Sequence, residues 1–288
     1  MKGASAVWAS VQAAALAHDP LARVPFFIDG REVGSVARAH LQALRIWPQW
    51  LAVQAYSVSL TATDRNAALA SINAALRDQG LVRAWRDELF AITDPGTGEH
   101  LACTERAAAR FWGTLTLGAH ANGYVADAQG RPTHLWIAHR SPTKATDPGL
   151  LDNLVGGGVP MGQTPLQALV REGWEEAGLS PAQMAAARAT SVIRLHRDIA
   201  EGLQLEDLHG FDLPLPAGTV PVNQDGEVAR FECLPVARAL AHALSGAMTL
   251  DAALVTLDFG LRHGLTPEAD AIGGSRSFGC GDGVDQMP

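Results

Sequence analysis

The alternation of apolar and polar residues divides the first part of the chain into short strands and helices. Residues 24–36 alternate as two strands around Asp29-Gly30, a dipeptide typical of a two-residue hairpin turn because glycine accepts a positive φ. Further helices are predicted at 40–44, 66–79 and 104–112, and a strand near 88–92. Mixed short elements of this kind indicate a small α+β unit.

The pattern changes at Gly113. Apolar runs beyond it predict strands at 114–117, 123–126, 135–139, 192–195, 208–213 and 228–233. Runs with a helical period lie at 165–177, 235–243 and 250–262. We therefore predict an N-terminal α+β domain over residues 1–112 and a second domain over 113–265. The glycine-rich tail at 266–288 is predicted to be disordered.

Residues 1–17 are alanine-rich, but polar residues interrupt the apolar run. This composition favours a helix that packs on the first domain over a cleaved leader peptide.

The helix predicted at 165–177 has capping residues at both ends. Thr164 is a suitable N-cap, Pro165 fits the first helical position, and Gln167 completes a capping box. Gly178 is a natural stop. A rotation of about 100° per residue places one apolar stripe against a core, and its members are Leu166, Leu169, Val170, Gly173 and Ala177.

Three glutamates, Glu172, Glu175 and Glu176, lie together on an adjacent flank near the end of this helix. Like charges three or four residues apart destabilise a helix by about 0.2–0.5 kcal/mol per pair, and the helix dipole adds to the repulsion. The cluster is therefore either a solvated acidic face or a cation site. The glycines at 156–158 favour the cation site, because a glycine loop lets the backbone approach a ligand closely. Mg²⁺ bridging carboxylate and phosphate oxygens suits such an arrangement.

The spacing of these residues resembles the Nudix box, GX5EX7REUXEEXGU, in which U is a bulky aliphatic residue. Gly157 is followed after five residues by Gln163 and after seven more by REGWEEAGL at 171–179. The chain is identified as a member of the Nudix family, and the resemblance implies an α-β-α sandwich with a mixed sheet between helices. Two positions depart from the box, since Gln163 replaces a glutamate and Gly173 replaces an aliphatic residue. In the family that glutamate supports the box arginine, so the departures predict reduced activity.

The resemblance extends to a two-domain Nudix subgroup labelled thiamine pyrophosphokinase-related. It is carried by PFFIDGREVG, HANGY, WIAHRSPTKATDPGLLDNLVGGGVP and PVNQDGEVARFECLP, and covers most of residues 20–265. It implies hydrolysis of a diphosphate, with thiamine diphosphate and its damaged oxo and oxy analogues as substrates. A Nudix hydrolase of another nucleoside diphosphate-X substrate is one alternative. A weakly active binding or sensor module is the other.

The resemblance also implies roles for particular residues. The metal ligands would be Glu172, Glu175 and Glu176, with the Gly156 carbonyl as an extra ligand. The ion would be Mg²⁺, with Mn²⁺ as a substitute. Arg171 would orient the glutamates. Glu227 lies in a loop before a strand, and is expected to be a metal ligand or general base rather than a solvated turn residue.

Four further residues are predicted to bind the substrate. Arg140 and Lys144 flank a loop ahead of the box and are expected to hold the terminal phosphate. A solvated basic loop is the alternative. His120 and Asn122 are expected to line the pocket, with a place in the core as the alternative.

Charge and cysteine content exclude several classes of protein. The net charge is −8 and no basic run is present, which argues against a nucleic-acid groove. Cysteines 103, 233 and 280 form no CxxC pair, so neither a zinc ribbon nor a disulfide framework is indicated and a cytoplasmic location is predicted. Isopentenyl diphosphate isomerases share the fold, but they need a cysteine ahead of the box, and none lies between 103 and 233.

No run reaches the roughly 18 apolar residues of a membrane span. The expected partner is a small-molecule diphosphate, and the choice between monomer and homodimer stays open.

Overall fold

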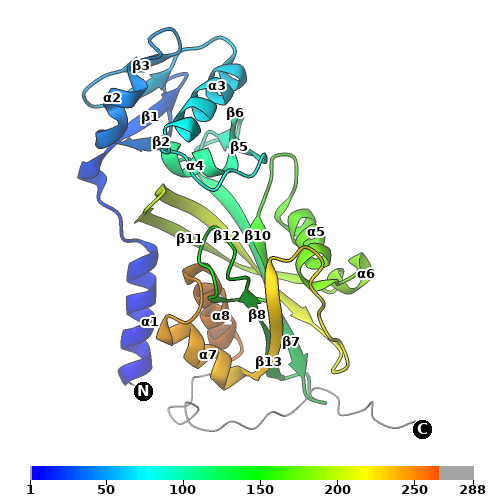
Figure 1. The fold of residues 1–288 in the computed structure, drawn as a ribbon. Helices are drawn as coiled ribbons and strands as arrows, with labels where there is room; N and C mark the ends of the chain where they lie inside the picture. Colours follow the sequence, from blue (N-terminus) through cyan, green and yellow to red (C-terminus); the bar gives the residue numbers. More distant parts are fainter. Residues whose placement is uncertain (1, 266–288) are drawn as a thin grey trace.

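A four-stranded sheet and its helices form the N-terminal domain, which caps one end of the second domain (Figure 1). The computed structural model describes residues 2–265. The strands follow the order β2-β1-β4-β3, and β5 and β6 pair separately. The elements of this domain are β1 (Arg23–Ile28), β2 (Arg31–Ala37), α2 (Leu41–Leu44), β3 (Leu51–Val53), β4 (Val58–Leu60), α3 (Arg65–Asp78), β5 (Leu89–Thr93), β6 (His100–Glu105) and α4 (Arg106–Trp112), with short 3₁₀ turns at Pro20–Ala22 and Arg38–His40.

The predicted hairpin between β1 and β2 is confirmed. Asp29 and Gly30 have φ values of 51° and 74°, which is the backbone that a type I′ turn requires. The strands and helices bury a core around Phe26, Ile72 and Trp112.

A seven-stranded mixed sheet forms the centre of the second domain. Five strands follow the order β11-β12-β7-β8-β13, while β10 pairs with β7 and β9 pairs with β8. The pair β12–β7 is parallel and the others are antiparallel. The strands are β7 (Thr116–Ala126), β8 (Pro132–Arg140), β9 (Leu151–Asp152), β10 (Val155–Gly158), β11 (Arg188–Ile199), β12 (Gly202–Pro214) and β13 (Val228–Pro235).

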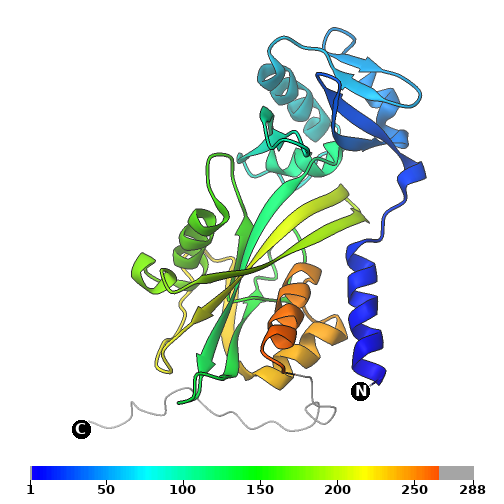
Figure 2. The same cartoon turned by 180° about the vertical axis from the view of Figure 1, so that it is seen from behind.

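Helices cover both faces of this sheet (Figures 1 and 2). One face carries α5 (Pro165–Ala177) and α6 (Pro181–Met184), which pack on alternate residues of β7. The other carries α7 (Val236–Ser245) and α8 (Leu250–Arg262), which pack on alternate residues of β8. A mixed sheet between helices, with a smaller α+β domain, is the fold class that the sequence predicted.

The first helix, α1 (Lys2–Ala15), packs on the second domain and not on the first. Trp8 and Val11 contact the core beneath α7 and α8, and Ala15 is buried beside β11 and β12. Figure 2 shows α1 alongside α8, with the linker rising from it to β1. The linker is fixed on the way, because Asp198 N–H donates to the Ala17 carbonyl at 3.0 Å. The predicted packing on the first domain was wrong, since adjacency in sequence does not determine which core buries an apolar helix.

Three other sequence predictions need correction. The strands expected at 114–117 and 123–126 are one continuous strand, β7. The helix expected to begin at 104 begins at Arg106, because residues 104 and 105 belong to β6. The glycine-rich loop expected at 156–158 is strand β10. The tail predicted to be disordered lies outside the described residues. Within residues 2–265, no helix is long and apolar enough to cross a membrane.

Candidate active site

A cleft of about 760 Å³ opens between the two domains. Its second-domain wall is formed by β10, by α5 and by the loops after β8 and before β13. The opposite wall comes from the N-terminal domain, and its members include Arg86, Glu88, Phe90 and Arg106. The volume is within the range of small-molecule sites.

Helix α5 begins and ends where the sequence predicted. Thr164 and Gln167 form the full capping box, and Gly178 adopts a left-handed φ of 65° at the end. The predicted apolar stripe is partly wrong, because Leu166 is 45% exposed and the buried side includes Glu176. The helix is therefore turned so that its acidic flank faces inward, and the alternative of a solvated acidic face does not hold for Glu176.

Each of the three glycines of β10 lies so close to a different neighbour that a larger residue would not fit. A Cβ on Gly156 would lie 2.7 Å from the His120 ring. A Cβ on Gly157 would lie 2.6 Å from Glu172 Oε1, and one on Gly158 would lie 2.6 Å from the Phe90 ring. These distances are below any normal contact. The glycines thus let the acidic helix, the imidazole and the N-terminal domain all approach one strand.

Glu176 is the most deeply placed glutamate of the box, with only 5% of its surface exposed. Its Oε2 accepts a hydrogen bond from Gly156 N–H at 2.9 Å, and its Oε1 lies 3.7 Å from Lys144 Nζ. Burial raises the pKa of Glu176 to about 8 even though Lys144 favours the ionised form. A nearby cation would oppose that shift.

Glu172 and Glu175 share one counter-ion, Arg171. The guanidinium donates to Glu172 Oε1 at 2.8 Å and to Glu175 Oε2 at 2.7 Å. Burial raises the pKa of Glu172, with Arg171 opposing it. Burial tends to lower the pKa of Arg171, but Glu172 and Glu175 raise it overall. Arg171 thus contacts both glutamates at once, and its expected role of orienting them stays a prediction.

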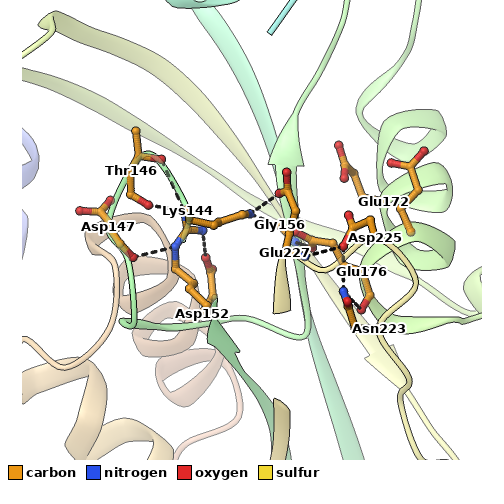
Figure 3. A network of polar contacts seen from close by, with 12 residues as sticks. Lys144, Thr146, Asp147, Asp152, Gly156, Glu172, Glu176, Asn223, Asp225 and Glu227 are labelled. Atoms are coloured by element: carbon orange, nitrogen blue, oxygen red, sulfur yellow. Dashed lines mark hydrogen bonds and ion pairs between the residues drawn. The ribbon is translucent and has the colours of Figure 1, made fainter. Parts of the chain in front are cut away.

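Glu227 and Lys144 form an ion pair in the middle of the cleft (Figure 3). The other oxygen of Glu227 accepts from Arg86 at 3.1 Å, so the carboxylate connects the two domains. Burial would raise the pKa of Glu227, but Lys144 and Arg86 together hold it below its usual range. Glu227 thus lies near Glu176, with Lys144 between the two carboxyl groups. Its expected role as a metal ligand or general base stays a prediction.

Arg140 lines the cleft, but its guanidinium is engaged by its own loop. It donates to Asp152 Oδ2 at 2.7 Å and to the carbonyls of Thr146 and Asp147 at 2.7 and 3.0 Å. Figure 3 shows Thr146, Asp147 and Asp152 grouped to one side of Lys144. Arg140 therefore shapes the loop that carries Lys144, whereas Lys144 extends into the cleft.

His120 and Asn122 lie on the same strand, but only His120 lines the cleft. Its Nδ1 lies 3.0 Å from Asn153 Oδ1. Asn122 is 1% exposed, donates to the Val255 carbonyl at 3.1 Å and accepts from Asn153. The prediction that Asn122 binds substrate was wrong, because its amide satisfies the backbone of α8 in the core.

The donor set fits Mg²⁺. Carboxylates and a backbone carbonyl are the hard oxygen ligands that this ion prefers, and it usually takes one or two protein carboxylates together with phosphates and waters. Among the side chains described, no three acidic, histidine or cysteine groups converge closely enough to hold a metal by themselves. Any metal ion held here would need oxygen ligands besides these side chains.

Several cleft residues were missed by sequence reasoning. Arg86, Glu88, Phe90 and Arg106 come from the N-terminal domain, more than fifty residues ahead of the box. No spacing signal connects them to it. Asp152 was also missed, although it lies just ahead of the glycine-rich stretch in the sequence.

Comparison with known proteins covers both domains. A family model described as NUDIX domain matches residues 116–252, and one described as Domain of unknown function (DUF4743) matches residues 9–116. Nudix hydrolase 24, chloroplastic, of Arabidopsis thaliana is 34% identical over 251 residues, which are 84% of this chain and 68% of that protein. Nudix hydrolase 20, chloroplastic, of the same plant is 39% identical over 209 residues, which are 72% of this chain and 55% of that protein.

The chain belongs to the Nudix hydrolase family, whose members act on diphosphate linkages and generally use a divalent metal ion. Among solved structures, the crystal structure of DR0079 from Deinococcus radiodurans is similar to it, with 22% identity and a TM-score of 0.44. That likeness covers 60% of this chain and 98% of the other.

Proposed function

We propose that this chain is a Mg²⁺-dependent pyrophosphohydrolase of thiamine-type diphosphates, with damaged oxo and oxy analogues as preferred substrates. The products are the monophosphate and inorganic phosphate. The observation that carries the proposal is the cleft itself, in which the three box glutamates and Lys144 face a second wall rich in arginine. The resemblance to the thiamine-related subgroup supports the choice of substrate.

Different residues of the cleft would contact the phosphate and hold the metal ion. Lys144, on a loop held by Arg140, would contact the terminal phosphate as a point charge. Glu172, Glu175 and Glu176 would hold Mg²⁺, with the Gly156 carbonyl as an additional oxygen. The ion supplies charge neutralisation of the phosphate oxygens and lowers the pKa of a bound water. Mn²⁺ would replace it.

Glu227 is proposed as the general base or as a further metal ligand. Its ion pairs with Lys144 and Arg86 keep it ionised, but they also lower its proton affinity. When Lys144 contacts a phosphate, Glu227 loses part of that stabilisation and becomes a better proton acceptor. Substrate binding and activation of the base would thus be linked through Lys144.

The charges in the cleft favour a substrate that carries both signs. Besides the box, the cleft contains Glu206 and Asp251, and Gln204 donates to both carboxylates at 3.0 and 3.2 Å. The cationic thiazolium of thiamine diphosphate and of its oxy analogue meets less repulsion in such a site than a purely anionic nucleotide does. His120 and Phe90 offer rings against which a flat heterocycle can stack.

A turnover screen with Mg²⁺ tests this function. The panel contains thiamine diphosphate, its oxo and oxy analogues, ADP-ribose, NADH and nucleoside triphosphates, each with and without EDTA. We expect the highest kcat/KM for the thiamine-type diphosphates. Glu176→Gln should lower turnover by at least about 100-fold, since even partners of metal ligands typically contribute about 10–100-fold.

Other outcomes of the screen have distinct meanings. Robust ATP hydrolysis without activity on thiamine diphosphates would reject the proposed substrate and keep the family assignment. Binding without turnover of any compound would indicate the sensor alternative. The cytoplasmic location and a homodimeric state stay predictions, and size-exclusion chromatography with light scattering tests the latter.

A further inference from the structure

A short segment of the N-terminal domain, residues 83–88, enters the cleft in a fixed conformation. Ala84 and Asp87 both have φ of 57°, which is uncommon for residues with a side chain. The buried carboxylate of Glu105 holds the segment, since it accepts from Arg86 N–H at 2.8 Å and from Ala107 N–H at 2.6 Å. The same side chain thus caps α4 and holds the segment, and Arg106 N–H donates to the Glu88 carbonyl at 2.8 Å, so hydrogen bonds anchor the backbone on both sides of the Glu88 side chain.

Glu88 uses its two oxygens on two different arginines. Oε2 accepts from Arg106 Nη1 at 2.9 Å, and Oε1 lies 3.8 Å from Arg171 Nη2. The side chain is only 22% exposed, so the ion pairs are partly shielded from water. Arg106 belongs to the same domain as Glu88, whereas Arg171 belongs to the Nudix box. Glu88 is therefore a direct contact between the N-terminal domain and the box.

Arg171 transmits this contact to the glutamates. The nitrogen that faces Glu88 is the same Nη2 that donates to Glu172, and Nη1 donates to Glu175. Gln163 stands where the box has a glutamate, and its buried Oε1 has no hydrogen-bond partner among the described residues. Outside α5, the carboxylate paired with Arg171 is thus supplied by Glu88.

We propose that Glu88 is a positioning residue of the hydrolytic site, which acts through Arg171 to hold Glu172 and Glu175 for the metal ion. The proposal rests on the function given above for the cleft. Its physical basis is competition for Arg171. When Glu172 and Glu175 turn toward a metal ion, they share their charge with it and hold Arg171 less strongly. Glu88 is outside the box and keeps the guanidinium in place.

Metal binding by the full chain tests the proposal without any substrate. Mn²⁺ affinity is measured by electron paramagnetic resonance of the free ion, for the wild type and for Glu88→Gln. We expect Glu88→Gln to weaken Mn²⁺ binding by about 10-fold, the lower end of the effect of residues that support metal ligands. Glu88→Asp keeps the charge and should recover part of the loss.

The matched control is Glu99→Gln. Glu99 is another glutamate of the N-terminal domain that binds an arginine, since it accepts from Arg31 at 2.5 Å, but it does not line the cleft. We expect this variant to bind Mn²⁺ like the wild type. Urea unfolding of each variant separates a weakened site from a weakened fold.

Arg171→Gln completes a double-mutant cycle. If Glu88 acts through Arg171, Glu88→Gln has little further effect in the Arg171→Gln background, because coupled residues are not additive. Equal Mn²⁺ affinity for Glu88→Gln and Glu99→Gln overturns the proposal. So does a full Glu88→Gln effect in the Arg171→Gln background, which would assign the effect to Arg106. A wild type that binds Mn²⁺ but hydrolyses no thiamine-type diphosphate would reject the proposed substrate and leave this inference in place.

Discussion

Individual residues of the site are held in energetically unfavourable states that a bound cation would relieve. Glu176 is a buried carboxyl with a raised pKa, and Glu172 is a half-buried carboxyl, also with a raised pKa, near two other glutamates. Lys144 and Arg171 provide partial compensation. The sequence predicted this tension from charge spacing alone, because repulsion along a helix is local. It did not predict which glutamate is deepest, since that depends on how α5 is rotated against the sheet.

The stability of the metal-free protein should depend on pH through Glu176. The folded chain keeps this proton up to about pH 8, whereas its ordinary pKa is 4.5. The folded state therefore binds more protons between these values, and the free energy of unfolding falls as the pH rises through this window. Glu176→Gln removes the titrating group and should show a flatter dependence.

Urea unfolding in EDTA at several pH values measures this difference. Above about pH 8 the variant should be the more stable of the two. A wild-type and variant pair whose difference in unfolding free energy is constant with pH would contradict the assignment.

Gln163 allows a second test at the residue scale. Its Oε1 is buried without a partner among the described residues, so the amide gains little from its place. We expect Gln163→Glu to tighten Mg²⁺ binding or raise kcat, because the box places a carboxylate here. The measurement is the Mg²⁺ dependence of turnover. An unchanged or lower rate would mean that the site is adapted to glutamine.

Among the elements, α5 and β10 show what the sequence could and could not determine. The ends of α5 were predicted correctly, because Thr164, Gln167 and Gly178 act on neighbouring backbone groups. Strand β10 was missed, because three consecutive glycines have low strand propensity. Its pairing with β7 is decided by neighbours distant in sequence, and here tertiary contacts overrode local preference.

Gly173 offers a test of the packing between α5 and α6. Met184 fills the space that an aliphatic side chain would take at this position, since a Cβ on Gly173 would lie 2.6 Å from Met184 Sδ. Gly173→Leu should therefore destabilise the fold by about 1–3 kcal/mol through overpacking. Met184→Ala should cost about 2–5 kcal/mol through a cavity.

The double variant should lose clearly less unfolding free energy than the sum of the two single losses, since the leucine occupies the space that the methionine leaves. Urea denaturation of the four proteins measures this coupling. Strict additivity would show that the two side chains do not compete for the same volume.

For the whole molecule, the feature that the sequence could not predict is how the domains meet. Their contact depends on groups such as the Leu89 carbonyl, which accepts from Met161 N–H at 2.8 Å, and on Phe90 above Gly158. Neither has a recognisable pattern of its own. The family resemblance located the box but could not indicate that the opposite wall of its cleft belongs to another domain.

The packing of α1 gives a prediction at this scale. Ala15 is buried against Leu195, Leu208 and Leu254 of the second domain. Ala15→Asp would bury an unpaired charge there and should lower the free energy of unfolding by about 2 kcal/mol or more. Ala14 is exposed, so Ala14→Asp is the matched control. Equal thermal stability of the two variants would show that α1 does not contribute to the second domain's core.

The position of α1 also bears on how the chain folds while it is being synthesised. The helix leaves the ribosome well before α8, against which it packs and which ends at Arg262. The first domain can complete its own core long before that point, since its residues are contiguous. Until α8 emerges, Trp8 and Val11 have no complete surface to cover them. During translation the second domain is therefore finished after the first, and until α8 emerges α1 is an exposed apolar helix that chaperones can bind.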